Sequence, residues 1–345
     1  MKTLSKGPSC EERVRVYFQR LGMYAVRSVP CRYNGIDISD IDVWLYSRPS
    51  PLSRHRINVD IKNKKTPQAI ERIFWSLGLC KSFGLDECIV VTTDRRDDVS
   101  TFGKSVGVSV LDGNFLPRLN SSDPTRPEIN RLSEEDFRAL IIRDRDLESA
   151  EGWYADYVDG KEKLLTALDF SGVNTHLSHC IARCQNITLR SQRIELASRL
   201  LAIHLSHFLI TLDFCMKDIL FKPETDRMTA LDHGFMYGSF GQSGIDRLLT
   251  RTDGLIRKYS PDNVSVSARI RDGLATDFKN RNYALLRDYF LKPDVAHDLF
   301  EMAVVCEGIA FGGTTIAFPA NFPAPIKAMI GVVADHAGLD RGKLL

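Results

Sequence analysis

The chain has 345 residues, of which 43% are hydrophobic and 26% are charged, and its net charge is +2 at pH 7. This length is sufficient for two domains, and this composition excludes a largely disordered chain. The small net charge gives no overall basic field that would by itself indicate a nucleic-acid partner.

Charge is unevenly distributed along the sequence. Residues 1–118 contain 19 Lys and Arg against 13 Asp and Glu, a net charge of +6, whereas the remaining residues contain 27 against 31, a net charge of −4. A basic amino-terminal part favours a polyanion as its partner. An excess of six positive charges is also compatible with an ordinary protein surface, so charge alone leaves both interpretations open.

The cysteines and the apolar segments indicate a cytoplasmic protein. The eight cysteines include no CxxC pair and no spacing typical of disulfide-rich domains. The start of the chain lacks the pattern of a secretory signal. The longest apolar stretch, residues 200–219, is interrupted by His, Ser, Asp and Lys residues, which favours a buried helix over a membrane span. We therefore expect a soluble protein without a membrane partner.

The first 118 residues are predicted to form an α/β domain with a mixed sheet. Helices are predicted where apolar residues recur every three or four positions, and strands where β-branched residues cluster. In chain order the predicted elements are a helix at 9–22, an extended segment at 24–30, strands at 41–47 and 55–62, a helix at 67–84, a strand at 88–93, a helix at 99–105 and a strand at 107–112. The order of helix, meander, helix, strand, helix, strand is typical of an α/β fold.

Residues 119–130 are rich in Ser, Pro, Asp and Asn, which predicts a linker. Beyond it, residues 131–345 show helical spacing almost throughout, so we predict an all-α domain. Recognition, dimerisation and regulation are the roles open to this domain, and a homodimer formed through it is one candidate partner.

The segment THLSHCIARC of this helical part is rich in His and Cys. His176, Cys180 and Cys184 share one helix face at a spacing that zinc ligands also use. One helix supplies too few ligands without a second source, so buried core side chains are the favoured interpretation. His204 and His207, on an apolar helix, are interpreted in the same way.

Three reactive side chains converge in the predicted sheet. Asp42 begins the strand at 41–47, and Asp60 and Lys62 end the strand at 55–62, where positions i and i+2 share a face. Carboxylates from adjacent strands are suitable ligands for a hard cation such as Mg²⁺ or Mn²⁺. Such a metal ion promotes phosphodiester hydrolysis, and the lysine would orient water and stabilise developing charge.

The pattern around these residues resembles a known nuclease core. A helix glutamate eleven residues before a glycine, then IDV, VDIKNKK, a helix and the strand IVVTT are similar to the PD-(D/E)XK core of Mrr-type restriction enzymes and archaeal Holliday-junction resolvases. The resemblance covers residues 9–115, about a third of the chain. It implies a restriction-endonuclease-like mixed sheet followed by the all-α domain.

The resemblance also assigns roles to individual residues. It implies that Asp42 is the first motif aspartate, Asp60 the second motif acid, Lys62 the motif lysine and Glu11 the accessory helix glutamate that completes the metal site. Ile41 stands where the family name has proline, and Asp60 stands where the family more often has glutamate. The adjacent Glu12 leaves the helix register open, although Glu11 lies on the apolar stripe and is preferred.

Basic side chains close to the motif are candidate ligands for phosphates that flank the scissile bond. These are Lys64, Lys65, Arg54 and Arg56. Gln68, at the start of the following helix, is a further candidate for the DNA or the metal-bound water, with an ordinary surface position as the alternative. The lysines are also compatible with a solvated strand edge that resists aggregation.

The sequence therefore predicts a metal-dependent endonuclease that hydrolyses phosphodiester bonds. The resemblance favours DNA over RNA, and a role in restriction or phage defence is an expectation by analogy. The alternative is a catalytically inactive nuclease-fold protein that binds nucleic acid or a protein partner.

Overall fold

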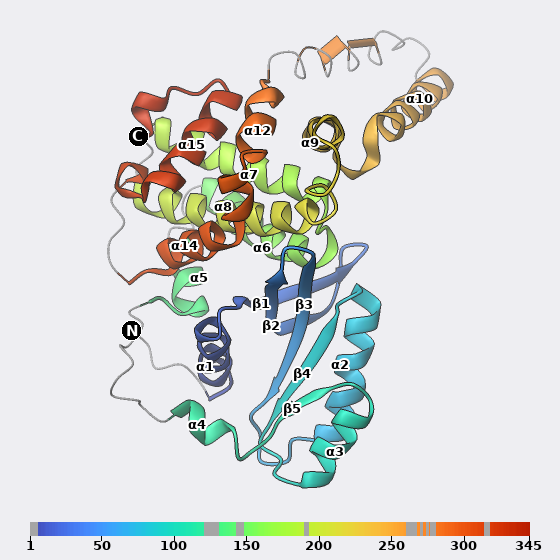
Figure 1. The fold of residues 1–345 in the computed structure, drawn as a ribbon, viewed down its shortest axis with the longest axis vertical. Helices are drawn as coiled ribbons and strands as arrows, with labels where there is room; N and C mark the ends of the chain where they lie inside the picture. Colours follow the sequence, from blue (N-terminus) through green and yellow to red (C-terminus); the bar gives the residue numbers. More distant parts are fainter. Residues whose placement is uncertain are drawn as a thin grey trace. The chain divides into compact units, whose positions relative to one another are not determined.

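A computed structural model describes residues 6–120, 131–142, 148–189, 193–259, 268–269, 272–273, 276, 281–313 and 318–345. The chain divides into two compact units, one containing the sheet and one helical (Figure 1). The first unit comprises Met1–Thr166 with Phe311–Thr314, and the second comprises Ala167–Ala310 with Thr315–Leu345.

The first unit is built on a mixed five-stranded sheet in the order β1-β2-β3-β4-β5. The first three strands form an antiparallel meander, whereas β4 runs parallel to β3 and β5 runs parallel to β4. Parallel neighbours require crossover connections, and helices α2 and α3 provide them. The strands are β1 (Tyr24–Tyr33), β2 (Ile36–Ser50), β3 (Ser53–Lys62), β4 (Glu87–Thr92) and β5 (Ser109–Leu111).

Helices cover both faces of the sheet. Helix α1 packs Val14 and Phe18 into an apolar cluster with Val43 and Val59 of the central strands. Helix α2 covers the opposite face, where Ser76 lies beside Asn58 of β3, and Figure 1 shows α1 and α2 on the two sides of the sheet. The helices of this unit are α1 (Lys6–Arg20), α2 (Ala69–Phe83), α3 (Asp97–Ser105), α4 (Leu116–Asn120), α5 (Glu134–Ile142) and α6 (Glu148–Thr166).

The predicted mixed α/β class and the order of elements are confirmed, but β2 is much longer than the predicted 41–47. Asn34 and Gly35, both with positive φ, form the tight turn that pairs Tyr33 with Ile36. The polar residues that follow Ile36 join the ladder through their backbone, so their side-chain polarity concealed the strand. Helix α2 begins at Ala69 rather than at residue 67, because Gln68 adopts a left-handed conformation.

The described residues of the second unit form helices joined by turns, with no strand among them. Helix α8 pairs with α7 and is buried over most of its length, as expected for the apolar stretch. Among the described helices it alone is long and apolar enough to cross a membrane, and 89% of its most apolar window is buried inside the protein. The helices of this unit are α7 (Phe170–Thr188), α8 (Ile194–Met216), α9 (Glu224–Tyr237), α10 (Gly241–Tyr259), α12 (Tyr283–Phe290), α13 (Pro293–His297), α14 (Leu299–Phe311) and α15 (Ala324–His336), with 3₁₀ turns η1 (Gly238–Phe240), η3 (Pro319–Asn321) and η4 (Arg341–Lys343).

The division between the units lies at Thr166, not at the predicted linker of 119–130. Helices α5 and α6 belong to the sheet-containing unit, where the Phe137 ring lies 5.2 Å from the Tyr157 ring and 4.6 Å from the Phe311 ring. Residues 121–130 lie outside the described residues, so the linker stays a prediction. Past β5 the described part of the chain contains no strand, only an isolated bridge between Arg131 and Gly312.

A cluster of four histidines lies between α7 and α8. The ring centroids of His179 and His204 are 4.8 Å apart, and those of His176 and His207 are 5.6 Å apart. His176, His204 and His207 are fully buried, as predicted for core side chains. Burial, reinforced by the charges of the neighbouring histidines and Arg183, holds the pKa of His204 well below its ordinary value.

The histidine cluster predicts that acid destabilises the helical unit. The unfolded chain takes up a proton at His204 near pH 6.5 and the folded chain does not, so stability is complete above pH 6.5 and is lost as the pH falls below it. When the pH falls from 6.5 to 5.5, the free energy of unfolding of the parent should therefore decrease. In His204→Phe, which lacks this titrating group, the decrease should be about 1 kcal/mol smaller. The measurement is urea unfolding at each pH, with the exposed His233→Phe as control. Equal losses in the parent and His204→Phe would contradict the prediction.

Candidate active site

Asp42 and Asp60 lie where the ladder between β2 and β3 opens. The antiparallel register runs as far as the pair Val43 and Val59. Immediately beyond it, the backbone N–H of Ile61 donates a hydrogen bond of 2.6 Å to Asp42 Oδ2. The Asp42 carboxylate thus accepts the hydrogen bond that a backbone carbonyl of β2 would accept if the ladder continued. Because side chains alternate along a strand, Asp60 points away from the cluster that contains Val59 and toward α2.

Asp60 is buried and already has a cationic partner. Its side chain is 6% exposed, and its two carboxylate oxygens accept hydrogen bonds from Arg72 of α2, one of them at 2.8 Å from Nε to Oδ2. This two-point contact with a guanidinium is a strong and directional ion pair. Sequence reasoning missed Arg72, although its place one helical turn into α2, facing the sheet, was a signal that could have found it.

The pKa of Asp42 depends on its burial and on the charges around it. Burial raises the pKa of the Asp42 carboxyl from 3.8 to about 7, while the hydrogen bond from Ile61 N–H lowers it. Asp60 and Glu11 raise it through charge repulsion, and Lys62 lowers it through attraction. The charges of Asp60 and Lys62 thus both act on the Asp42 carboxyl. At neutral pH a nearby cation would favour the ionised carboxylate.

Glu11 influences Asp42 but is engaged elsewhere. Its carboxylate lies 2.7 Å from Nη2 of Arg27, a β1 side chain that is only 1% exposed. Glu12 contacts the same guanidinium at 3.0 Å, and Glu135 accepts two hydrogen bonds from it at 3.0 and 2.9 Å. Both candidate glutamates of α1 thus neutralise a buried arginine. Within the described residues, no group of three or more His, Cys, Asp or Glu side chains is arranged to hold a metal ion, and the role of Glu11 as a third ligand stays a prediction.

The predicted phosphate ligands separate into two groups. Lys64, Lys65 and Gln68 are exposed on the segment that follows β3, at the same end of the strand as Lys62. Arg54 and Arg56 lie near the other end of β3, roughly 20 Å from Lys62 along an extended strand.

The interactions of Arg54 and Arg56 are structural. Arg54 is buried and donates to the backbone carbonyls of Ser50, Pro51 and Ser53, whereas Arg56 pairs with Asp86 at 3.0 Å. The prediction that these two arginines flank the scissile phosphate is not supported, because closeness in sequence along a strand is not closeness in space.

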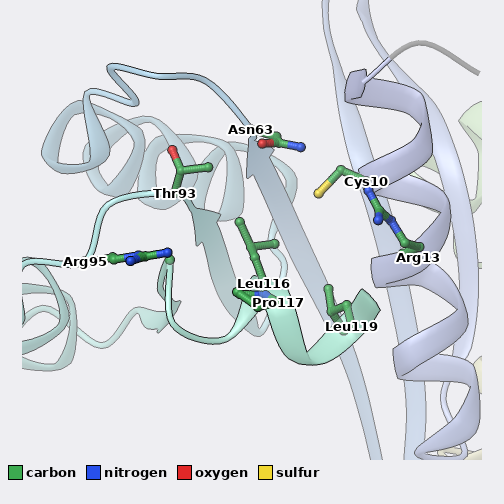
Figure 2. A pocket seen from close by; sticks show the side chains of 9 residues that line it. Cys10, Arg13, Asn63, Thr93, Arg95, Leu116, Pro117 and Leu119 are labelled. Atoms are coloured by element: carbon green, nitrogen blue, oxygen red, sulfur yellow. The ribbon is translucent and has the colours of Figure 1, made fainter. Parts of the chain in front are cut away.

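A pocket that sequence reasoning did not identify is lined by α1 and by the segments after β3, β4 and β5. It has a volume of about 390 Å³ and opens at the carboxyl ends of β3 and β4, between α1 and α4 (Figure 2). Asn63, which directly follows Lys62, forms one wall. The ends of parallel strands are common ligand sites, so the strand order was a signal that could have indicated it. The lining residues are Cys10, Arg13, Asn63, Thr93, Arg95, Gly113, Leu116, Pro117 and Leu119.

No protein-family model, curated protein or solved structure matches the chain.

The ion pair between Arg72 and Asp60 predicts a defined loss of stability. Arg72→Leu leaves a buried carboxylate without its partner, and we expect the free energy of unfolding to fall by about 2–3 kcal/mol, at the low end for buried pairs because Arg72 is partly exposed. Lys81→Leu, an exposed position on the same helix, is the matched control and should change stability little.

A double variant separates the ion pair from packing. Adding Asp60→Asn to Arg72→Leu removes the unpaired charge, so it should recover much of the lost stability in urea unfolding. A double variant no more stable than Arg72→Leu alone would mean that the two side chains are not coupled.

Proposed function

We propose that the protein is a metal-dependent nuclease that hydrolyses phosphodiester bonds in nucleic acid. The observation that supports this most directly is that the charges of Asp60 and Lys62 act on the Asp42 carboxylate, which accepts a hydrogen bond from Ile61 on the adjacent strand. The order of one helix, an antiparallel meander, a helix and a parallel strand around them is compatible with the PD-(D/E)XK core that the sequence resembles. That resemblance favours DNA as the substrate and defence against foreign DNA as the context.

Two carboxylates of this site fit a divalent cation. Mg²⁺ is commonly held by one or two carboxylates, with water and substrate oxygens as its other ligands, and Asp42 and Asp60 provide that donor set. The repulsion from Asp60 that raises the pKa of Asp42 is the kind that a bound cation relieves. When bound, Mg²⁺ or Mn²⁺ would polarise the phosphate and lower the pKa of a water molecule.

The side chains of the site would orient the Asp42 carboxylate, position the attacking water and bind the flanking phosphates. The hydrogen bond from Ile61 fixes the orientation of the Asp42 carboxylate. Lys62, two positions after Asp60, would hold the attacking water and stabilise the charge that develops on the phosphate. Lys64, Lys65 and Gln68, exposed just beyond, would bind phosphates on either side of the scissile bond.

A second candidate function is binding without cleavage. The observation that favours it is the two-point ion pair between Arg72 and Asp60. A carboxylate already neutralised by a guanidinium attracts a cation less strongly, so the same fold would then bind nucleic acid or a protein partner through its basic surface. Mg²⁺ binding and cleavage distinguish the two functions.

Cleavage of labelled nucleic acid tests the proposal. We expect Asp42→Asn and Asp60→Asn to abolish cleavage in Mg²⁺ or Mn²⁺, because each removes one charged metal ligand. Lys62→Met should reduce the rate by about 10²–10³-fold, the loss typical of a residue that stabilises the transition state. The substrates are duplex DNA, single-stranded DNA and RNA, each with metal ion and with chelator.

The control for this experiment is Lys81→Ala, an exposed lysine on the outer side of α2, which should cleave at the parent rate. Binding in chelator should survive in all variants, because phosphate contacts outside the site provide most of the affinity. Parent-rate cleavage by Asp60→Asn would refute the mechanism, and binding without any cleavage by the parent would favour the second candidate.

Metal binding is tested without catalysis by thermal unfolding. Because Arg72 and a cation compete for Asp60, Mg²⁺ should raise the melting temperature of Arg72→Leu more than that of the parent. The triple variant Arg72→Leu with Asp42→Asn and Asp60→Asn should show no such rise. An equal effect of Mg²⁺ on all three proteins would argue against a cation at this site.

A further inference from the structure

The pocket between α1 and α4 has cationic side chains on two of its walls. Arg95 points into it from the segment after β4, and Arg13 lies across from it on α1 (Figure 2). Among the nine lining residues none is Asp or Glu. Arg13 also donates from Nε to the Ser9 carbonyl oxygen at 3.1 Å, which holds its side chain against α1 at the pocket wall. A lining with cationic side chains and no carboxylate attracts an anion. The pocket is therefore suited to a negatively charged group.

The Arg95 guanidinium is available for such a group. It has no hydrogen bond or ion pair with any residue in the described part of the chain, and the side chain is exposed. The neighbouring acid, Asp94, pairs with Arg96 instead, at 2.7 Å. Because Asp94 is satisfied by Arg96, it does not neutralise the charge that Arg95 presents to the pocket.

The backbone keeps Arg95 in this position. A Cβ atom on Gly113 would lie 2.4 Å from the Thr93 carbonyl oxygen and 2.7 Å from Cγ of Arg95, so only glycine allows the two segments to approach so closely. The hydroxyl of Thr93 also donates to the backbone carbonyl of Lys64. This bond joins the segment after β4 to the segment after β3, and thereby fixes the pocket relative to Lys62.

The rest of the lining complements a nucleotide rather than a bare ion. The polar side chains of Asn63 and Thr93 lie on one side, and Leu116, Pro117 and Leu119 provide an apolar floor (Figure 2). A volume of about 390 Å³ lies within the range of small-molecule sites. An apolar floor beneath an anion-binding rim matches a phosphate attached to a sugar and base.

We propose that this pocket binds a phosphate group of a nucleotide in the nucleic-acid strand, with Arg13 and Arg95 as its cationic ligands, next to the site of hydrolysis. The inference rests on the proposed function and adds a subsite to it. The phosphate is either a monoester at the end of a strand or a diester within it. Both carry the same chemistry, and the experiment distinguishes them.

The test is the binding of short single-stranded oligonucleotides in chelator, measured by fluorescence anisotropy. One oligonucleotide carries a 5′-phosphate, one a 3′-phosphate and one neither. The proteins are the parent, Arg13→Ala, Arg95→Ala, and Lys104→Ala as control, since Lys104 is an exposed lysine of α3 that does not line the pocket. Salt concentration is held constant, because all such affinities depend on it.

Each pattern of affinities has one meaning. If a terminal phosphate occupies the pocket, the parent binds one phosphorylated oligonucleotide about tenfold more tightly, and the arginine variants lose this preference while Lys104→Ala keeps it. If an internal phosphate occupies it, Arg13→Ala and Arg95→Ala weaken all three oligonucleotides beyond the effect of Lys104→Ala. Arginine variants that bind every oligonucleotide as Lys104→Ala does would overturn the proposal.

A second measurement separates this inference from the proposed function. Inorganic phosphate should raise the melting temperature of the parent above that in chloride of equal ionic strength, and Arg95→Ala should lose the difference. If the parent binds no nucleic acid, the proposed function fails, and an equal rise in Arg95→Ala then overturns the pocket as well. If binding depends on the arginines but Mg²⁺ produces no cleavage, only the catalytic proposal fails.

Discussion

The hydrogen bond from the Ile61 backbone to the Asp42 carboxylate lies at the point where β2 separates from β3. Up to Val43 and Val59 the backbones satisfy one another, but Ile61 is buried and its N–H needs an acceptor once the ladder has ended. The Asp42 side chain supplies that acceptor and is drawn into the protein in doing so. Burial then raises the pKa of the carboxyl. The other charged groups of the site are distributed around this half-buried acid.

Charge balance around Asp42 and Asp60 depends on α2. Two neighbouring carboxylates withdrawn from water need cations to remain ionised. Lys62 provides one from the same strand, and Arg72 provides the other from α2. The unit thus compensates Asp60 with its own side chain, and its fold does not depend on a metal ion for that purpose. A divalent cation that bound Asp60 would have to compete with Arg72 for the two carboxylate oxygens.

Local patterns in the sequence were sufficient for part of the site and insufficient for the rest. The positions of Asp42, Asp60 and Lys62 on neighbouring strands could be predicted, because strand alternation and the order of elements are readable over short windows. Their role as a reactive site stays a prediction. The ion pair between Glu11 and Arg27 could not be predicted, since Arg27 also binds Glu135, which lies 108 positions after Arg27 in the chain. The prediction placed Arg54 and Arg56 too close to Lys62, because each residue of an extended strand adds about 3.3 Å of length.

The compact units divide the chain at Thr166, away from the predicted linker, for a similar reason. The composition of residues 119–130 is typical of a linker. Which compact unit a helix joins depends on long-range side-chain contacts, and these could not be predicted from the sequence. Phe137 of α5 stacks on Phe311, a residue 174 positions away, and Lys161 of α6 pairs with Glu134 at 2.7 Å. These contacts make α5 and α6 part of the sheet-containing unit, although their helical spacing alone favoured the all-α part.

At one edge of the sheet in the first unit, the basic side chains are exposed to solvent, whereas the carboxylate of Asp60 is buried. The parallel strands β3 and β4 end together there, and the segments that leave them expose Lys64, Lys65 and Arg95. Asp60 is buried behind them. In the proposed function, a polyanion that approached this edge would meet the exposed positive charges before the carboxylates. Attraction at the surface and carboxylates that a cation would have to neutralise are the two electrostatic conditions that the proposed hydrolysis would impose on this site.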